Sequence, residues 1–201
     1  MGKIKAVLFD FGGVLAEEGF RNGLLELGRR QGLNPQAVSE NGRRIVHQSG
    51  YVIGRGSEGD FWRQMRQETG LRGTDEELSA VILSSFVLRP RMLDFVRRLR
   101  AGGLITAIVS DQTDWLERLD RRDGFSAEFH RVFNSYRLGK SKWDASVFDD
   151  VARELAIAPA AALFTDDTRE HVERAISRGM QGIVFEDEES FLRQAEKLLK
   201  A

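Results

Sequence analysis

Five short and nearly continuous apolar runs recur along the chain, separated by segments with helical periodicity. The runs are residues 4–9, 104–109, 131–134, 161–164 and 182–185. Because their apolar residues are consecutive rather than alternating, they predict strands that are covered on both faces. Strands that alternate with helices through right-handed crossovers indicate an α/β fold with a doubly wound parallel sheet.

Amphipathic segments between these runs supply the expected helices. Residues 91–103 place Met92, Phe95 and Leu99 at helical spacing and end in two glycines, which is typical of a helix end. Asp144 is a good N-cap for a helix over residues 144–157. The same pattern predicts helices over the segments 169–180 and 188–200.

The interval between the first and second predicted strands contains no convincing strand. Instead it holds four helical segments, at residues 21–33, 34–48, 57–70 and 74–86. Thr74 and Glu77 have the spacing of a capping box, and Ser57 and Asp60 have a similar spacing. An insert of this size predicts a separate helical lobe. The expected domains are a core of residues 1–15 and 90–201 and a helical cap of residues 16–89.

Composition excludes several classes of protein. Of 201 residues, 30 are basic and 31 acidic, so the net charge of −1 gives no support for binding nucleic acid or an anionic membrane. The chain has no cysteine, which excludes disulfides, thiolate zinc sites and cysteine nucleophiles. Its longest apolar run, residues 104–109, is far shorter than the ~20 residues of a membrane-spanning helix. Asp10 interrupts the N-terminal run too early for a signal peptide, so we expect a cytoplasmic protein.

Side chains with chemical potential follow several of the predicted strands. In an open parallel sheet, ligands bind beyond the carboxyl ends of the strands. Each of these side chains alone has an ordinary explanation as a turn residue, a helix cap or a solvated group. Their coincidence at one edge is what indicates a site. They are Asp10 after the first strand, Ser110 and Asp111 after the second, Asp166 and Asp167 after the fourth, and Lys140 and Lys142 before the helix at 144.

Together these groups suit a phosphate monoester. Two or three carboxylates can hold Mg²⁺, which prefers oxygen ligands. Asp10 can attack phosphorus and form an aspartyl-phosphate, while a lysine, Ser110 and the cation neutralise the charge on the phosphoryl group. Gly12 and Gly13 let the backbone turn sharply and approach the metal and the phosphate.

The ordered set of motifs resembles the haloacid dehalogenase (HAD) superfamily. "VLFDFGGVL", residues 7–15, is similar to its first motif, and Ser110 is similar to its second. "LGKSKWDASVF", residues 138–148, resembles the third and selects Lys142 over Lys140. "LFTDDTREHVERAISRGMQGIVF", residues 163–185, resembles the fourth. The helical insert resembles the C1 cap of the subfamily that includes β-phosphoglucomutase and many sugar-phosphate phosphatases.

This resemblance implies a Rossmann-like core, Mg²⁺ as cofactor and a cap that closes over the substrate. It implies Asp10 as the nucleophile, with Ser110 and Lys142 contacting the phosphoryl group. The implied metal ligands are Asp10, Asp166, Asp167 and the backbone carbonyl of Gly12. The substrate contacts that we expect are Gly13, Asp111 and Arg55, with His47 as a further candidate.

Gly12 departs from the motif. Most phosphatases of the family carry at this position an aspartate that protonates the leaving group and later activates water. A positioned general acid or base contributes ~10²–10⁴ in rate, so Gly12 indicates a slow enzyme, an undemanding leaving group or a replacement acid. Asp111 and His171, which also depart from the usual motif residues, are candidate replacements. Trp143 stands where the family has proline after the lysine, and Thr168 where it more often has serine or asparagine.

The predicted function is a Mg²⁺-dependent phosphatase acting on a small phosphorylated metabolite such as a sugar phosphate. The alternative is a HAD-like protein that has lost the chemistry and binds a phosphorylated ligand or a protein partner, which turnover would distinguish. A dehalogenase needs no metal, so the pair Asp166 and Asp167 argues against it. Receiver domains are shorter and lack a helical insert. We expect a monomer or homodimer, with no nucleic-acid or membrane partner.

Overall fold

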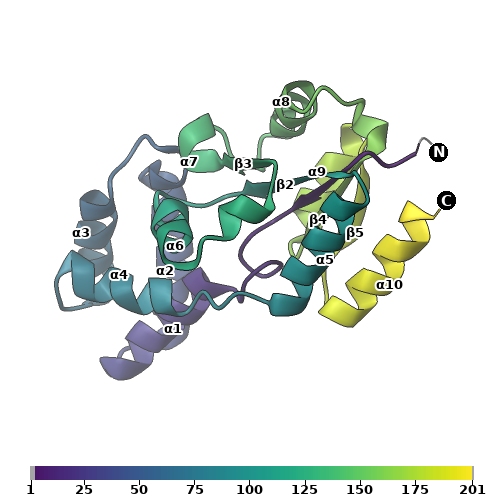
Figure 1. Ribbon diagram of the computed structural model, residues 1–201. Helices are drawn as coiled ribbons and strands as arrows, with labels where there is room; N and C mark the ends of the chain where they lie inside the picture. The colour runs from purple at the N-terminus through teal and green to yellow at the C-terminus, as the bar shows by residue number, and fades with distance from the viewer. Residues whose placement is uncertain (1–2, 201) are drawn as a thin grey trace.

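The computed structural model describes residues 3–200. Over these residues, five parallel strands form one sheet in the order β3-β2-β1-β4-β5 (Figure 1). The central strand β1 pairs with β2 on one side and with β4 on the other. This is the doubly wound α/β fold that the apolar runs predicted. The strands are Ala6–Phe9 (β1), Ile105–Ser110 (β2), Arg131–Asn134 (β3), Ala162–Asp166 (β4) and Gln181–Val184 (β5).

Alternate residues of β1 face opposite sides of the sheet, and both sides are covered. Ala6 and Leu8 pack in a cluster with residues of α8 (Ser146–Glu154) and α9 (Arg169–Ser177). Val7 and Phe9 pack in a second cluster with residues of α5 (Pro90–Ala101) and α10 (Glu188–Leu199). All four side chains are fully buried, so the uninterrupted apolar run reflects burial on both faces (Figure 1).

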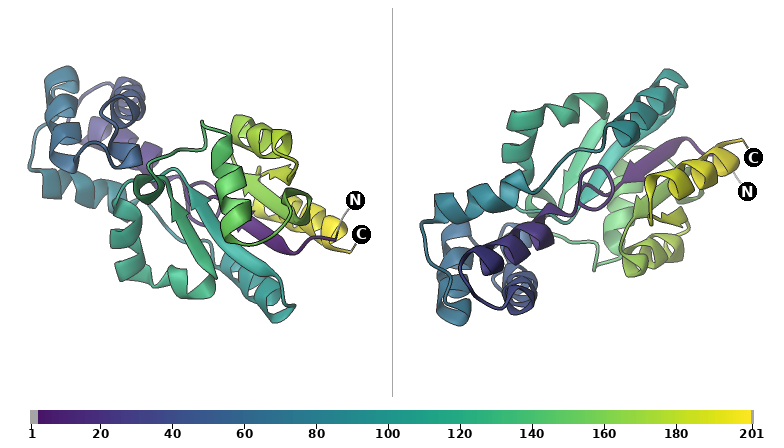
Figure 2. Two further views of the ribbon diagram at one scale, coloured as in Figure 1. Left: turned by 90° about the horizontal axis from the view of Figure 1, so that it is seen from above. Right: turned by 90° about the horizontal axis from the view of Figure 1, so that it is seen from below.

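Between β1 and α5 the chain forms a helical unit, which lies at one end of the sheet (Figure 2). Thr74 and Glu77 form the predicted capping box of its last helix. At Ser57 the box is incomplete, because the carboxylate of Asp60 accepts from the Ser57 hydroxyl rather than from its backbone N–H. The elements are α1 (Gly19–Arg30), α2 (Pro35–Gln48), the 3₁₀ turn η1 (Tyr51–Ile53), α3 (Glu58–Thr69) and α4 (Asp75–Ser84).

Some helices differ from the sequence-based expectation. Helix α6 (Trp115–Asp123) was not predicted, because six of its nine residues are charged and only three are apolar. The helix expected from Asp144 begins at Ser146, since Asp144 Oδ1 accepts from the Ser146 N–H in a turn, at 3.0 Å.

Among residues 3–200, no helix combines the length and the apolar character that crossing a membrane requires. The short elements are η2 (Phe125–Glu128), α7 (Ser135–Leu138) and η3 (Pro159–Ala161).

Partly and fully buried polar contacts tie the helical unit to the segments that follow β2 and β3. The carboxylate of Glu58, in α3, accepts from Trp115 Nε1 at 2.9 Å and from Arg118 Nη1 at 3.0 Å, both in α6. The Ser135 hydroxyl, after β3, donates to the Val52 carbonyl of η1 at 2.6 Å. These contacts hold the helical unit over the carboxyl ends of the strands.

Candidate active site

Asp10 directly follows β1, and a tight loop of two glycines positions it. Asp10 is 8% exposed, and its Oδ1 accepts from the Phe11 N–H at 2.7 Å. Gly13 has a φ of +83°, which favours glycine, and a Cβ there would lie 2.2 Å from Asp167 Oδ2. The loop can therefore approach Asp167 only because residue 13 has no side chain.

Three carboxylates converge where β1 and β4 end. Asp10, Asp166 and Asp167 each offer an oxygen, and these atoms lie within 4.8 Å of one another. Asp166 is completely buried, whereas Asp167 is exposed. A cluster of carboxylate oxygens suits a hard divalent cation such as Mg²⁺, because the cation relieves their mutual repulsion. The cluster can therefore hold a metal ion.

The ammonium group of Lys142 lies between two of these carboxylates. Its Nζ is 2.9 Å from Asp10 Oδ1 and 2.5 Å from Asp166 Oδ2, and the side chain is only 2% exposed. The backbone N–H of Lys142 donates to Asp111 Oδ1 at 2.8 Å, so Asp111 anchors the loop. Lys140 instead contacts Asp150, away from the acidic cluster. The structure thus places Lys142 at the site and Lys140 outside it.

Burial and charge act against each other on these groups. Burial raises the pKa of Asp10 above its usual range, Lys142 opposes this change, and the two neighbouring carboxylates reinforce it. Burial also opposes ionisation of Asp166, but Lys142 and His171 hold the pKa of its carboxyl below the usual range. Burial likewise opposes the charged form of Lys142, but Asp10 and Asp166 outweigh it and raise the pKa of the ammonium group. The lysine therefore stays charged beside the Asp10 carboxylate.

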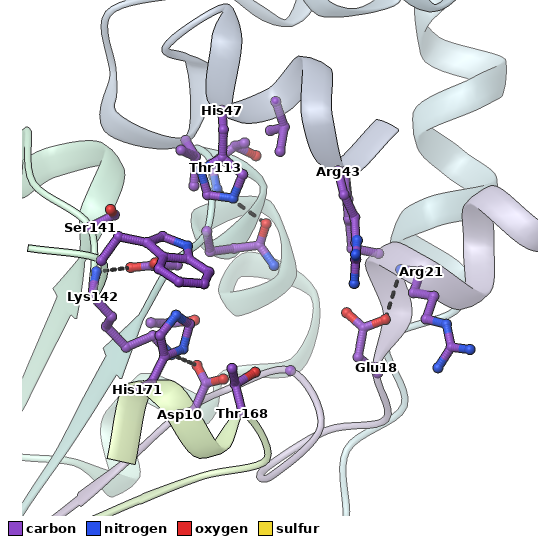
Figure 3. A pocket seen from close by; sticks show the side chains of 18 of the residues that line it. Asp10, Glu18, Arg21, Arg43, His47, Thr113, Ser141, Lys142, Thr168 and His171 are labelled. Atoms are coloured by element: carbon purple, nitrogen blue, oxygen red, sulfur yellow. Dashed lines mark hydrogen bonds and ion pairs between the residues drawn. The ribbon is translucent and has the colours of Figure 1, made fainter. Parts of the chain in front are cut away.

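A cavity of about 1060 Å³ opens above this cluster, between the sheet edge and the helical unit (Figure 3). Gly13 and Asp166 lie buried beneath its lining. Arg55 is exposed and does not line it, although His47 does. The remaining sequence-predicted site residues all line the cavity: Asp10, Gly12, Ser110, Asp111, Lys142 and Asp167.

His171 and Trp143 form one wall of the cavity. His171 Nδ1 lies 3.3 Å from Asp166 Oδ2, and the buried Nε2 has no hydrogen-bond partner within residues 3–200. Trp143 meets the imidazole edge to face, with ring centroids 5.1 Å apart, and the Arg174 guanidinium lies 4.4 Å from the centroid of the indole. Trp143, which replaces the family's usual proline, thus packs over His171.

Glu18 is a cavity residue that the sequence reasoning did not identify. It precedes α1, and its Oε2 accepts from the Arg21 N–H at 2.8 Å. Burial raises the pKa of the carboxyl to about 7, although the Arg21 N–H bond opposes this change. Figure 3 shows Arg43 of α2 pointing towards Glu18. The only sequence signal was the acidic pair Glu17 and Glu18, just after the apolar residues that follow Gly13.

A parallel α/β sheet with acids and a buried lysine at its carboxyl edge, and with a helical insert after β1, defines a hydrolytic enzyme with a Rossmann-like core. The sequence identifies which one. Residues 4–177 match the haloacid dehalogenase-like hydrolases, and the chain belongs to this family.

Relatives and solved structures agree with this assignment. An enolase-phosphatase E1 of Acidiphilium cryptum is 33% identical over 98 residues, which cover 47% of this chain and 41% of that protein. The chain spans less than half of the length of the curated relatives it matches. A predicted HAD-like family hydrolase of Porphyromonas gingivalis superposes with a TM-score of 0.77 and 19% identity, covering 100% of both chains. A HAD family enzyme of Bacteroides thetaiotaomicron, in complex with magnesium and inorganic phosphate, superposes with a TM-score of 0.73 and 21% identity, covering 94% of this chain and 98% of that one. At 19% and 21% identity, these superpositions show a shared fold and no more.

Proposed function

We propose that this chain is a Mg²⁺-dependent phosphatase that hydrolyses a small phosphorylated metabolite through an aspartyl-phosphate on Asp10. The observation that carries the proposal is the position of Lys142. Its ammonium group contacts Asp10 and Asp166 at the floor of a cavity that can accept a small molecule. A nucleophilic carboxylate must be ionised, and the Lys142 cation favours the ionised form of Asp10 against the burial that raises the pKa of its carboxyl.

The reaction follows from this arrangement. An ionised Asp10 oxygen attacks phosphorus, the bond from phosphorus to the leaving oxygen breaks, and its electron pair stays on that oxygen. Lys142 and Ser110 stabilise the negative charge that develops on the phosphoryl oxygens. Water then attacks the phosphorus of the aspartyl-phosphate, the bond to Asp10 breaks, and inorganic phosphate leaves.

The acidic cluster fits a divalent cation. Asp10, Asp166, Asp167 and the backbone carbonyl of Gly12 would hold it, because all four present oxygen. Lys142 supplies a single positive charge against three carboxylates that lie within 4.8 Å of one another. When bound, Mg²⁺ supplies electrostatic stabilisation of the transferring phosphoryl group.

The comparisons support the reaction class and leave the substrate to experiment. One relative is an enolase-phosphatase, and one structure of similar fold holds magnesium and inorganic phosphate. We propose that residues 16–89 act as a cap over a core of residues 1–15 and 90–201, because the cavity lies between them. A sugar phosphate as substrate, a cytoplasmic location and a monomeric or dimeric state are the accompanying hypotheses.

A second candidate is a protein that binds a phosphorylated ligand without turning it over. Gly12 is the observation that favours it, because the usual general acid is absent from the position two residues after Asp10. Such a protein would keep the acidic cluster and still bind Mg²⁺, so metal binding does not separate the two candidates. Catalytic turnover does.

The deciding experiment is phosphate release from a panel of sugar phosphates, acyl phosphates and nucleotides, with Mg²⁺ and with a chelator. Asp10→Asn is measured alongside, since it removes the nucleophile with little change in shape. The proposal predicts metal-dependent release that this variant abolishes. Release at the level of Asp10→Asn on every compound would favour the binding protein.

A further inference from the structure

The space beside Gly12 borders the carboxylate of Glu18. A Cβ on Gly12 would lie 3.4 Å from Phe86 Cε1 and 4.0 Å from Glu18 Oε1. The φ of Gly12 is not in the left-handed region, so the backbone there accepts an ordinary side chain. An aspartate at this position would therefore extend its carboxylate into the region that Glu18 already occupies.

We propose that Glu18 is the general acid and base of this enzyme, and that it performs from the residue before α1 the task usually performed by the residue at position 12. The inference rests on the proposed phosphatase function. Glu18 lines the cavity together with Asp10, at the edge where the helical unit begins. In Figure 3, Lys142 and His171 lie on one side of Asp10 and Glu18 lies on the other.

Packing fixes the backbone on both sides of Glu18. A Cβ on Gly19 would lie 2.3 Å from Phe86 Cγ, so the chain is pressed against that ring. The Glu17 N–H donates to the Val87 carbonyl at 2.8 Å. Phe86 thus borders both the space at Gly12 and the backbone that carries Glu18. A carboxyl group held in this way keeps its position relative to Asp10, as general acid–base catalysis requires.

The two oxygens of Glu18 have different surroundings. Oε2 accepts from the Arg21 N–H at 2.8 Å, whereas Oε1 faces Gly12 and forms no hydrogen bond within residues 3–200. A protonated carboxyl can keep Oε2 as an acceptor while Oε1 carries the proton. Partial burial favours this neutral form. Glu18 can therefore cap α1 and donate a proton without changing its conformation.

Asp111 and His171, the other candidate acids, lie on the Lys142 side, and each uses one side-chain atom in a contact there while the other, Asp111 Oδ2 or His171 Nε2, has no partner within residues 3–200. Asp111 Oδ1 accepts from the Lys142 N–H at 2.8 Å and so holds the lysine loop. His171 Nδ1 lies 3.3 Å from Asp166 Oδ2, beneath Trp143. In an in-line displacement the leaving oxygen lies opposite the attacking Asp10 oxygen. Of the three candidate acids, only Glu18 lies on the side of Asp10 away from Lys142 (Figure 3).

The proton balance is complete with Glu18 in this role. As Asp10 attacks, the bond from phosphorus to the leaving oxygen breaks. The leaving oxygen takes the proton from Glu18 Oε1 and departs as an alcohol. The Glu18 carboxylate then accepts a proton from the water that attacks the aspartyl-phosphate. The bond between phosphorus and Asp10 breaks, phosphate leaves, and Glu18 is protonated again.

Dependence on the leaving group tests this role. Glu18→Gln keeps the shape of the side chain and an acceptor for the Arg21 N–H, but it cannot donate an acidic proton. Its kcat/KM, which reports the first chemical step, is compared on an alkyl phosphate and on p-nitrophenyl phosphate, whose leaving group needs no proton. We expect the alkyl ester to lose ~10²–10⁴ in kcat/KM and the aryl ester less than about tenfold. With the aryl ester, a burst of p-nitrophenolate should precede slow turnover, because the second step lacks its base.

Two further variants complete the design. Glu17→Gln changes the exposed neighbour, which pairs with Arg89, and should leave both kcat/KM values within about twofold of the wild type. Gly12→Asp combined with Glu18→Gln places a carboxyl in the same region from the other side and should restore alkyl-ester hydrolysis at least tenfold over Glu18→Gln alone.

If the wild type hydrolyses both esters and Glu18→Gln loses the same factor in kcat/KM on each, the role of Glu18 is overturned while the phosphatase function stands. An unchanged kcat/KM for the alkyl ester would do the same. Absence of metal-dependent turnover of either ester by the wild type would overturn the phosphatase itself and, with it, the role of Glu18.

Discussion

Lys142 donates a 2.5 Å hydrogen bond to Oδ2 of Asp166, and both side chains are almost completely buried. Two charges in this environment offset the cost of each other's desolvation, so removal of one leaves the other uncompensated. The pair joins the loop before α8 to the end of β4. It therefore contributes to folding as well as to the proposed chemistry.

We expect Lys142→Met to lower the free energy of unfolding by about 3–5 kcal/mol in the presence of a chelator, because Asp10 and Asp166 lose their cation. Urea unfolding measures the change. Lys140→Met is the matched control, since Lys140 pairs with Asp150 at a partly exposed position and should cost about 1 kcal/mol or less. Equal effects of the two substitutions would contradict this account of the buried pair.

We expect Gly13→Ala to destabilise the protein more than Gly103→Ala does. Both glycines have positive φ, at +83° and +80°, so each alanine carries a similar backbone cost of about 1–2 kcal/mol. A Cβ on Gly13 would also lie 2.2 Å from Asp167 Oδ2, whereas a Cβ on Gly103 meets nothing within 4 Å. The additional cost should be about 1–3 kcal/mol in urea unfolding, with loss of phosphate release. Indistinguishable stabilities would show that the loop relaxes around the new methyl group.

Removal of Asp167 should abolish most of the thermal stabilisation by Mg²⁺. A ligand at 100 times its Kd stabilises the native state by about 2.7 kcal/mol, and the wild type should show an upward shift of Tm with millimolar Mg²⁺. Asp167→Asn removes one of three converging carboxylates at an exposed position, so the protein should still fold. Glu173→Gln, at an exposed position of α9, is the control. If Asp167→Asn keeps the wild-type shift, Mg²⁺ binds elsewhere.

Glu58 should contribute substantially to the attachment of the helical unit. Its carboxylate accepts from Trp115 and Arg118 of α6 and from the Ser79 hydroxyl of α4. Glu58→Ala leaves these donors without their acceptor, which should cost about 1–3 kcal/mol in the free energy of unfolding. Glu173→Ala should stay within about 0.5 kcal/mol of the wild type. A Glu58→Ala cost that small would mean that water replaces the carboxylate.

The position of the acidic cluster could be anticipated from local rules, and that of Lys142 from the resemblance to the family's third motif. Consecutive apolar residues indicate strands buried on both faces, and the carboxyl ends of parallel strands share one edge. Asp10, Asp166 and Asp167 therefore had to lie near one another. The resemblance to the family's third motif selected Lys142 over Lys140, and only Lys142 lies among the carboxylates.

Other features depend on tertiary packing and could not be anticipated. Glu18 lies outside every strand end, and it reaches the space beside Gly12 because the chain packs against Phe86, 68 positions later than Glu18 in the sequence. Helix α6 has only three apolar residues, and the contacts of Trp115 and Arg118 with Glu58 hold it against the helical unit. Arg55 had been expected to contact substrate because of its charge, but the structure places it outside the cavity lining.

Trapping the phosphoryl group on Asp10 tests the aspartyl-phosphate intermediate directly. Enzyme quenched during turnover is treated with borohydride, which reduces an aspartyl-phosphate to homoserine, and the modified residue is located by peptide mass spectrometry. We expect homoserine at position 10 only when both substrate and Mg²⁺ are present. Substrate turnover with no homoserine at position 10, or with the label on another acid, would contradict this expectation.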